Sequence, residues 1–303
     1  MKAHALRQIW TNTTLAVLAA GAMAFGGFLP AEAWADEAKP QRIVSVNLCV
    51  DQIVLDLVPR DRIKGLSFLA TDPTMSLLSG EAEGIESVQG AAEEILALDP
   101  DLVLAGEYTT GPTVDLLRRL GRRVEIVPMA SSFEGIRQVV RRLAALTGEK
   151  DRGEALIADF DMRLQEVKTR AVVRSDGPRP RAVAFQVNSL ASGEGSLVDE
   201  VLSQAGFANL ARSARVGPGG RLPLEILISD PPDLIVRANS ARDFRTVLGD
   251  NLRHPAFQAL EQTRPSVDMP MNEWLCGTTR IVKAVERLAV AREQLILRAE
   301  ATR

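Results

Sequence analysis

The 303-residue sequence is poor in the side chains that hold bare metal ions and that stack on nucleic-acid bases. It has two His, two Cys and one Tyr, and 4% of its residues are aromatic. Receptors for bare Zn²⁺ or Mn²⁺ need several His and carboxylate ligands around the ion, and beyond the N-terminal segment His254 is the one His present. The net charge is −3, with acidic and basic residues interspersed. A site for a bare metal ion and a basic, aromatic-lined groove for nucleic acid are therefore both excluded.

The N-terminal segment is predicted to be an export signal and not part of the fold. A weakly basic start is followed by an uncharged, mostly apolar stretch over residues 13–29. Ala33 and Ala35 then place small residues at the two positions that a signal peptidase reads. The apolar stretch is short and rich in Gly and Ala for a membrane span, which needs about 20 strongly apolar residues. We expect residues 1–35 to be a cleaved signal peptide and the mature protein to lie in the periplasm. An uncleaved membrane anchor is the alternative.

Short apolar runs alternate with helical patterns along the mature sequence, which is typical of parallel α/β sheets. A first series of buried strands is predicted at residues 43–46, 63–66, 102–105 and 124–127, and a second at residues 182–187, 234–237 and 266–269. Helices are predicted between them at residues 51–58, 92–98, 113–120, 196–205 and 244–260. Two α/β lobes follow from this pattern.

A long helix is predicted between the two series. Ser131 and Glu134 form a capping-box pattern that starts one helix, and Gly148 ends it. Apolar residues then recur every three or four positions up to Ala171, which predicts a second helix of about 25 residues. We therefore divide the mature chain into an N-terminal lobe (residues 36–148), a linking helix (149–176) and a C-terminal lobe (177–303). Because a helix makes the crossing, the lobes are expected to move little relative to each other.

One short motif occurs in both lobes. A Glu opens a short apolar helix, a Pro-Asp pair stops that helix, and a buried strand follows. Each lobe also begins with an Arg directly before an apolar strand. The matching residues are Glu93, Pro100-Asp101 and Arg42 in the first lobe, and Glu225, Pro232-Asp233 and Arg181 in the second. The recurrence at corresponding places supports a duplicated lobe.

In these segments the chain resembles the helical-backbone periplasmic binding proteins for ferric siderophores, haem and cobalamin. The resemblance covers nearly all of the mature chain and is carried by residues 42–45, 93–104, 192–196 and 274–278. It implies two Rossmann-like lobes with parallel sheets, joined by a long rigid interlobe helix, with the ligand in a shallow cleft between them. It also implies the solute-binding component of an ABC importer. The first choice of ligand is a ferric siderophore or other iron complex, and cobalamin or haem is the alternative.

Candidate ligand contacts lie at the carboxyl ends of the predicted strands, where open parallel sheets bind their ligands. They combine aromatic rings, amides and a positive charge, which suits a chelate with apolar flanks and a polar rim. The candidates are Asn47, Cys49, Phe68, Tyr108, Gln186, Arg237, Trp274 and Cys276. Trp274 is favoured as the aromatic anchor, because its position resembles a ligand-contacting Trp of the hydroxamate-siderophore branch. Packing between loop and sheet is the alternative for Trp274.

The resemblance also implies the partners of the protein. Glu93 and Glu225 are similar to the surface glutamates that dock onto arginines of the permease. The expected partners are thus the ABC permease dimer of the inner membrane and a small-molecule metal chelate, with no nucleic acid, and the protein itself is expected to be a monomer. Either Glu taken alone could instead complement the dipole of its helix. No resident cofactor or metal ligand is expected, because the metal should arrive inside its chelator.

Cys49 and Cys276 depart from the pattern of the better-known members of this family. Each is predicted in a loop that lines the cleft, one in each lobe. Three interpretations remain open: a disulfide across the cleft, a thiolate contact to the ligand or its metal, and two unrelated buried thiols. An oxidising compartment permits pairing, which also requires Cα atoms within about 7 Å.

A hypothesis from another class is an exported thiol-dependent hydrolase, with Cys49 as nucleophile and His254 as base. The sequence suggests no residue to orient that His, and no nucleophile-elbow pattern surrounds Cys49. No glycine-rich phosphate loop follows the first strand, which also argues against an enzyme with a bound nucleotide. A binding protein without catalytic residues is therefore predicted.

Overall fold

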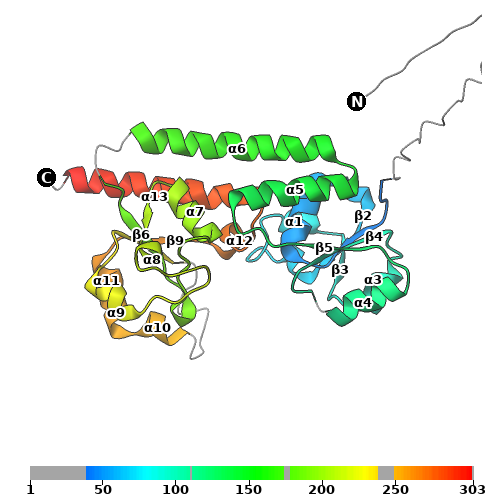
Figure 1. Cartoon of the computed structure of the whole chain (residues 1–303), viewed down its shortest axis with the longest axis horizontal. Coiled ribbons are helices and arrows are strands. Elements are labelled where there is room, and N and C mark those ends of the chain that lie inside the picture. Colours follow the sequence, from blue (N-terminus) through cyan, green and yellow to red (C-terminus); the bar gives the residue numbers. More distant parts are fainter. Residues whose placement is uncertain (1–38, 110, 174–177, 238–248, 302–303) are drawn as a thin grey trace, which may run out of the picture. The chain divides into compact units, whose positions relative to one another are not determined.

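The computed structural model describes residues 39–109, 111–173, 178–237 and 249–301. The predicted signal peptide lies outside these residues. The chain from Lys39 onward forms one compact unit, and Figure 1 labels its helices and strands.

The first sheet has five parallel strands in the order β3-β2-β1-β4-β5. Its strands are β1 (Ile43–Ser45), β2 (Ile63–Ser67), β3 (Glu86–Val88), β4 (Leu102–Gly106) and β5 (Val124–Val127). The helices between them are α1 (Leu48–Leu57), α2 (Ser79–Ala82), α3 (Ala92–Ala97) and α4 (Gly111–Arg119), with 3-10 turns η1 (Arg60–Arg62) and η2 (Phe68–Thr71). The chain order changes direction between β1 and β4, so this pair forms the topological switch point of the sheet.

The second sheet has four parallel strands in the order β7-β6-β8-β9. Its strands are β6 (Arg181–Ala184), β7 (Ala208–Asn209), β8 (Leu234–Arg237) and β9 (Ser266–Asp268). The accompanying elements are η3 (Val187–Ser189), α7 (Leu197–Gln204), α8 (Leu210–Ser213), α9 (Leu224–Ser229), α10 (Asp250–Arg253), α11 (Pro255–Thr263), α12 (Met271–Trp274) and η5 (Thr279–Ile281). Its switch point lies between β6 and β8.

Successive residues of the central strands enter different cores, as the two-residue period of a strand requires. In β4, Leu102 and Leu104 pack in one cluster with the long helices, whereas Val103 and Ala105 pack with α3 and α4. In the second sheet, Ala182 and Ala184 join that same central cluster, while Val183 packs with α8, α9 and α11. Each sheet is thus covered on both faces, and one face of each borders a shared core.

Three long helices make up the shared core. They are α5 (Phe133–Thr147), α6 (Lys150–Val173) and α13 (Val282–Ala301). Figure 1 shows α6 running along both α5 and α13, and it packs on both. Phe160 of α6 is fully buried and meets Phe133 of α5 edge-to-face, with ring centroids 5.6 Å apart. Arg163 of α6 makes two hydrogen bonds of 2.9 Å to the carboxylate of Glu286 in α13. The structure confirms the predicted fold class, two α/β lobes with parallel sheets joined by a long helix.

The repeated motif has a structural explanation in both lobes. The carboxylate of Asp101 accepts hydrogen bonds from the backbone N–H groups of Gln41 and Arg42 at 2.6 and 3.0 Å. The side chain of Arg42 donates in turn to the carbonyls of Leu98 and Asp99, at the end of α3. These bonds fix the end of the short helix to the start of the first strand.

The second lobe repeats this arrangement with equivalent residues. Asp233 accepts from the backbone N–H of Arg181 at 2.7 Å, and the Arg181 side chain donates to the carbonyls of Asp230 and Pro231 at the end of α9. The Arg and the Asp of the motif are therefore structural. Neither Glu93 nor Glu225 takes part in these bonds.

Some elements differ from their predictions for local physical reasons. Helix α5 is capped by Ser132 and not by Ser131, since the Ser132 hydroxyl accepts from Gly135 N at 3.0 Å. The helix predicted at residues 244–260 lies partly outside the described residues, and its described part is broken between α10 and α11 at Pro255, which lacks the N–H needed to continue a helix. Strands β3 and β7 were not predicted, because they are short edge strands without an apolar run.

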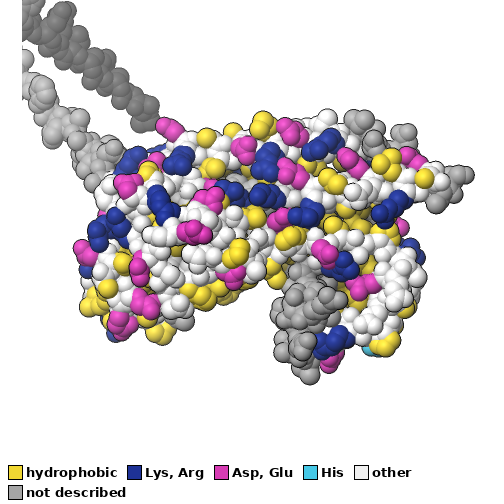
Figure 2. All heavy atoms as spheres, turned by 180° about the vertical axis from the view of Figure 1, so that it is seen from behind, with side chains coloured by type: hydrophobic (Ala, Val, Ile, Leu, Met, Phe, Trp, Pro, Cys, Tyr) yellow, Lys and Arg dark blue, Asp and Glu magenta, His cyan; other side chains and the backbone are white. Residues whose placement is uncertain are grey.

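The surface mixes charges of both signs. On the face in Figure 2, Lys and Arg side chains alternate with Asp and Glu, and neither sign covers a continuous area. None of the described helices is long and apolar enough to cross a membrane.

Candidate functional site

Large apolar side chains are exposed where several strands end. Phe68 follows β2, Tyr108 follows β4 and Met129 follows β5, with exposed fractions of 46%, 81% and 59%. Leu275, directly after α12, is also exposed. Exposing such residues has a free-energy cost in water, and their location at the carboxyl edge of a parallel sheet is where such sheets bind ligands. We call Phe68, Tyr108, Met129 and Leu275 the apolar rim.

Polar candidates lie at the two switch points. Asn47, after β1, accepts hydrogen bonds from the backbone N–H groups of Cys49 and Val50 through Oδ1, and thereby caps α1. In the second sheet, the main chain of Gln186 follows β6 and is held by Leu190 and by the Asn251 amide. The amide of Asn47 is thus held as the cap of α1, whereas at Gln186 the main chain is fixed.

Arg237 already has acidic partners. Its Nε donates to Asp268 at 2.7 Å, and its Nη1 lies 3.9 Å from Glu261. The sequence could not show these neighbours, which come from the adjacent strand β9 and from α11. An anionic ligand would have to compete with both carboxylates, so Arg237 is a weaker candidate for an anion contact than the sequence indicated.

Trp274 is located in the core and not in an open loop. It ends the short helix α12, its exposed fraction is 9%, and it belongs to the shared hydrophobic cluster. The sequence placed it after the last strand, where either packing or ligand contact was possible. Its burial favours packing. The exposed aromatic rings at the strand ends are those of Phe68 and Tyr108.

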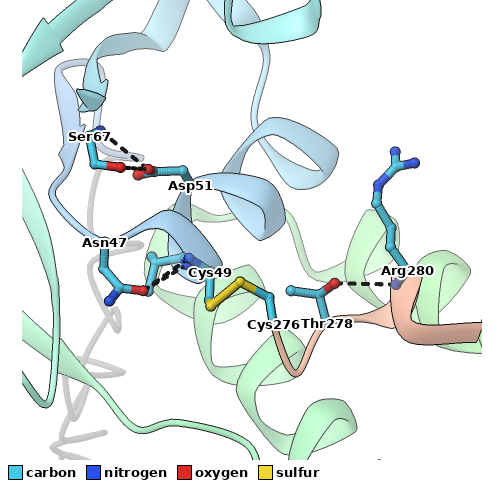
Figure 3. Close-up of a disulfide and its surroundings, with 8 residues drawn as sticks. Asn47, Cys49, Asp51, Ser67, Cys276, Thr278 and Arg280 are labelled. Carbon is cyan, nitrogen blue, oxygen red and sulfur yellow. Dashed lines mark hydrogen bonds between the residues drawn. A yellow bond between two sulfur atoms is a disulfide. The ribbon is translucent and has the colours of Figure 1, made fainter. Parts of the chain in front are cut away.

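A disulfide joins the two predicted cleft cysteines. Sγ of Cys49, in the first turn of α1, is bonded to Sγ of Cys276, and the Cα atoms are 5.2 Å apart (Figure 3). The bond connects residues 227 positions apart in the sequence. Of the three interpretations, the structure therefore has the disulfide, and neither sulfur is available as a thiolate ligand.

The segment from α12 to η5 makes further contacts with the first lobe. The amide of Asn272 donates to the carbonyl of Pro73 at 2.8 Å, and Arg280 donates to the carboxylate of Asp56 in α1 at 2.5 and 3.0 Å. Gly277 lies so close to the chain after β5 that a Cβ on it would be 2.5 Å from the Ala130 carbonyl oxygen. The segment that follows β9 is thus fixed to loops at the carboxyl ends of β1, β2 and β5.

Asp51 is a buried carboxyl group on α1, two residues after the disulfide-bonded Cys49 (Figure 3). Oδ2 accepts from the hydroxyl and the backbone N–H of Ser67, whereas Oδ1 and the Ser45 hydroxyl have no partner of good geometry among the described residues. Burial raises the pKa of Asp51 from 3.8 to about 7, and the neighbouring Ser45 and Ser67 only partly offset this rise. The sequence pattern gave no sign of this group, since an Asp in the first turn of a helix is ordinarily exposed.

The hydrolase hypothesis lacks its proposed nucleophile. Cys49 is in the disulfide, and no free cysteine is present. His254 is exposed and accepts a hydrogen bond from Ala256 N through Nδ1, so it acts as the N-cap of α11. Within the part of the chain that the structure describes, no group of three or more His, Cys, Asp or Glu side chains could hold a metal ion.

Residues 43–264 match the family model described as periplasmic binding protein, and the chain belongs to this family. A cobalamin-binding protein of Halobacterium salinarum is 29% identical over 207 residues, which cover 68% of this chain and 56% of that protein. An iron-uptake system-binding protein of Bacillus subtilis is 28% identical over 128 residues, which cover 42% of this chain and 38% of that protein. The matched region thus spans about half of the first relative and less than half of the second.

Solved structures share the fold over nearly their whole length. A periplasmic heme-binding protein from Roseiflexus sp. RS-1 in apo form superposes with a TM-score of 0.69 at 24% identity, covering 84% of this chain and 99% of that one. The periplasmic vitamin B12 binding protein of Vibrio cholerae superposes with a TM-score of 0.61 at 20% identity, covering 85% and 98%. These similarities show the two-lobe fold.

Removal of the disulfide should destabilise the protein. The free energy of unfolding of the double variant Cys49→Ser/Cys276→Ser is expected to be about 2–4 kcal/mol lower than that of the oxidised protein. The reason is that the bond closes a very long loop and restricts the unfolded chain. Urea unfolding of the oxidised protein, the variant and the protein kept in reductant measures this difference. Reduced protein should match the double variant. Equal stability of the oxidised protein and the variant would contradict the prediction.

Asp51→Asn should change how stability depends on pH. The folded chain binds the Asp51 proton more tightly than the unfolded chain, so this residue lowers the free energy of unfolding as pH rises from about 4 to about 7. The variant should equal the wild type near pH 4 and exceed it by at least about 1 kcal/mol at pH 8. Urea unfolding at pH 4, 6 and 8 tests this.

The matched control for Asp51 is Asp56→Asn on the same helix. Asp56 pairs with Arg280, so its loss should reduce stability at pH 8. If the free energies of unfolding of the wild type and of Asp51→Asn differed by the same amount at pH 4, 6 and 8, the raised pKa of Asp51 would be contradicted.

Proposed function

We propose that the protein is the periplasmic solute-binding component of an ABC importer, which captures a metal chelate and delivers it to the permease. The observation that carries this proposal is the apolar rim at the carboxyl ends of β2, β4, β5 and after α12. Apolar side chains exposed at the binding edge of a periplasmic binding protein suit a ligand with large apolar flanks. An organic chelator around a metal ion has such flanks.

Two ligand classes fit this surface. A ferric siderophore or other iron complex is the first choice from the sequence. The relatives add support for tetrapyrroles, since their names describe cobalamin and heme binding as well as iron uptake. In either class the metal is already enclosed by its chelator, so the protein need supply only apolar contacts and hydrogen bonds to the rim of the ligand.

A rigid receptor is proposed as part of this function. The two lobes share one hydrophobic cluster, and the segment from α12 to η5 is fixed to the first lobe by a disulfide, an ion pair and a hydrogen bond. A large hinge closure would have to break several of these contacts. The ligand is therefore expected to bind to a surface that exists before it arrives.

Docking to the permease is proposed to use Glu93 and Glu225. Both are exposed residues in the first turns of the equivalent helices α3 and α9, and neither makes a hydrogen bond or ion pair within the described residues. The rest of each motif is used in structural bonds, so these carboxylates are free to pair with Arg side chains of a partner. Ile226 and Ile228, next to Glu225, are also exposed and could add apolar contact.

Chelate binding should depend on Phe68 and Tyr108. Each single Ala variant is expected to weaken binding by about 1–3 kcal/mol, the usual effect of truncating an aromatic anchor. Fluorescence-quench titrations with ferric hydroxamate and catecholate siderophores, haem and cobalamin test this. A chain cleaved after residue 35 keeps Trp274 as its one Trp, which simplifies the signal.

Leu120→Ala is the matched control for these two variants. Leu120 is equally exposed but follows helix α4 and not a strand, so its loss should leave the dissociation constant unchanged. If none of the four chelates bound with a micromolar or lower dissociation constant, or if both aromatic variants bound normally, the proposed ligand surface would be wrong.

Reversal of both docking charges should separate transport from binding. Glu93→Lys/Glu225→Lys is expected to reduce chelate uptake by cells at least tenfold and to abolish association with the permease, because the two carboxylates that attract the partner's Arg side chains are replaced by two ammonium groups that repel them. The chelate dissociation constant should not change. The control Glu86→Lys/Glu166→Lys reverses two exposed charges outside α3 and α9 and should transport normally. Normal uptake by the docking variant would exclude this assignment.

A further inference from the structure

A cavity lies between the long helices and α7, and no residue of the apolar rim lines it. Its volume is about 700 Å³, and it is bordered by α5, α6, α7, α13 and the residues before β6. None of the predicted ligand contacts lines it. We call this cavity the interhelix groove. Its lining residues are Phe133, Glu134, Arg137, Asp161, Leu164, Gln165, Lys168, Ala171, Arg179, Glu200, Ser203, Gln204, Gly206 and Arg292.

The acidic groups of the groove already have partners. Asp161 accepts two hydrogen bonds from Arg137, at 2.6 and 2.9 Å. Glu134 lies 3.3 Å from the same Arg137, and the carboxylate of Glu200 accepts from the backbone N–H of Phe133 at 2.5 Å. None of these carboxylates lies within ion-pair distance of the other cations of the groove.

Three cations of the groove have no such partner. Lys168 of α6, Arg179 before β6 and Arg292 of α13 make no hydrogen bond or ion pair within the described ranges, although Glu293 acts weakly on Arg292 from a distance. Their charges add, because no carboxylate lies within bonding distance of them. These three cations therefore carry charge that no ion pair among the described residues compensates, whereas Arg137 is paired with both Asp161 and Glu134.

Arg292 is the most unusual of the three cations. Its exposed fraction is 3%, and its Nε is fully buried without a hydrogen-bond partner. Burial lowers the pKa of Arg292, and the nearby charge of Arg179 lowers it further. A guanidinium nonetheless stays charged in proteins, and a buried charge without a partner is costly.

The backbone after α7 packs directly against this guanidinium, and the contact requires glycine at position 206. Gly206 has a φ of 89°, and a Cβ on it would lie 2.8 Å from Arg292 Nε. The neighbouring Gln204 amide donates to the carbonyl of Leu164 at 2.7 Å, which fixes α7 against α6. Arg292 is thus held in a fixed position with unused donors, and the adjacent cavity is large enough for a small molecule.

We propose that the interhelix groove binds a small soluble oxyanion, of the phosphate or polycarboxylate class, through Arg292, Arg179 and Lys168. A planar guanidinium donates two parallel hydrogen bonds to an oxyanion, and the two further cations favour a multiply charged one. The site is separate from the chelate surface and does not depend on the proposed transport function. Occupation of the groove would bridge α6, α13 and the start of the second lobe.

Calorimetric titration of the protein with inorganic phosphate and with citrate, in a chloride buffer of constant ionic strength, tests this proposal. We expect saturable binding of at least one of the two anions. The variant Lys168→Ala/Arg179→Ala should weaken that binding at least tenfold. Both residues are exposed, so the variant should fold normally. Arg170→Ala is the matched control, because Arg170 lies on the same helix as Lys168 but does not line the groove. The affinity of this variant for the anion should stay within twofold of the wild-type value.

Arg292 itself can be observed without mutation. The NMR signal of its Nε–H should shift on titration with the bound anion and saturate with the calorimetric dissociation constant. No binding of phosphate or citrate at millimolar concentration would overturn the proposal, as would binding that the double variant leaves unchanged. If the protein bound vesicles that contain an acidic phospholipid but bound neither free anion, the proposal of a soluble oxyanion would be wrong. The ligand of the three cations would then be a lipid headgroup.

Discussion

The segment that follows the last strand of the second sheet fixes the carboxyl edges of both sheets in one place. The Cys49–Cys276 disulfide and the Arg280–Asp56 ion pair connect it to helix α1, and the Asn272–Pro73 hydrogen bond connects it to the chain after β2. Together with the close approach of Gly277 to Ala130, these bonds hold α1 and the segments that follow β2 and β5 against the second lobe. The shared core around α6 would otherwise be the main connection between the lobes. The proposed ligand surface depends on this double connection.

The proposed sites lie on different parts of the molecule. The carboxyl ends of the strands expose aromatic and apolar residues, the outer helices α3 and α9 expose one unpaired Glu each, and the long helices enclose a cationic groove. Many surface Arg side chains pair with nearby acids, among them Arg141, Arg163 and Arg287. Glu93 and Glu225 are candidates for recognition because they recur at equivalent exposed places in both lobes, and Arg292 is one because its buried Nε has no hydrogen-bond partner among the residues that the structure describes.

Much of the fold could be predicted because the relevant signals are local. Strands such as β4 and β8 are continuous apolar runs, and α5 and α6 keep a regular spacing of apolar residues over many turns. The repeated Arg, Glu and Pro-Asp pattern could be seen without the structure, although its reason, the bonds from Asp101 and Asp233 back to the strand starts, could not. The short edge strands β3 and β7 were missed, since two or three residues with exposed side chains carry no periodic signal.

The sequence alone determined the two-lobe architecture, the family resemblance and the choice of strand ends as the binding edge, because each depends on the order of residues along the chain. Tertiary structure decided whatever depends on residues that are distant in sequence. It brought Cys49 within 5.2 Å of Cys276, buried Trp274 and Asp51, gave Arg237 two acidic neighbours and left the buried Nε of Arg292 without a hydrogen-bond partner in the described part of the chain. A side chain's burial and partners come from other segments of the folded chain, and no local pattern encodes which segments those will be.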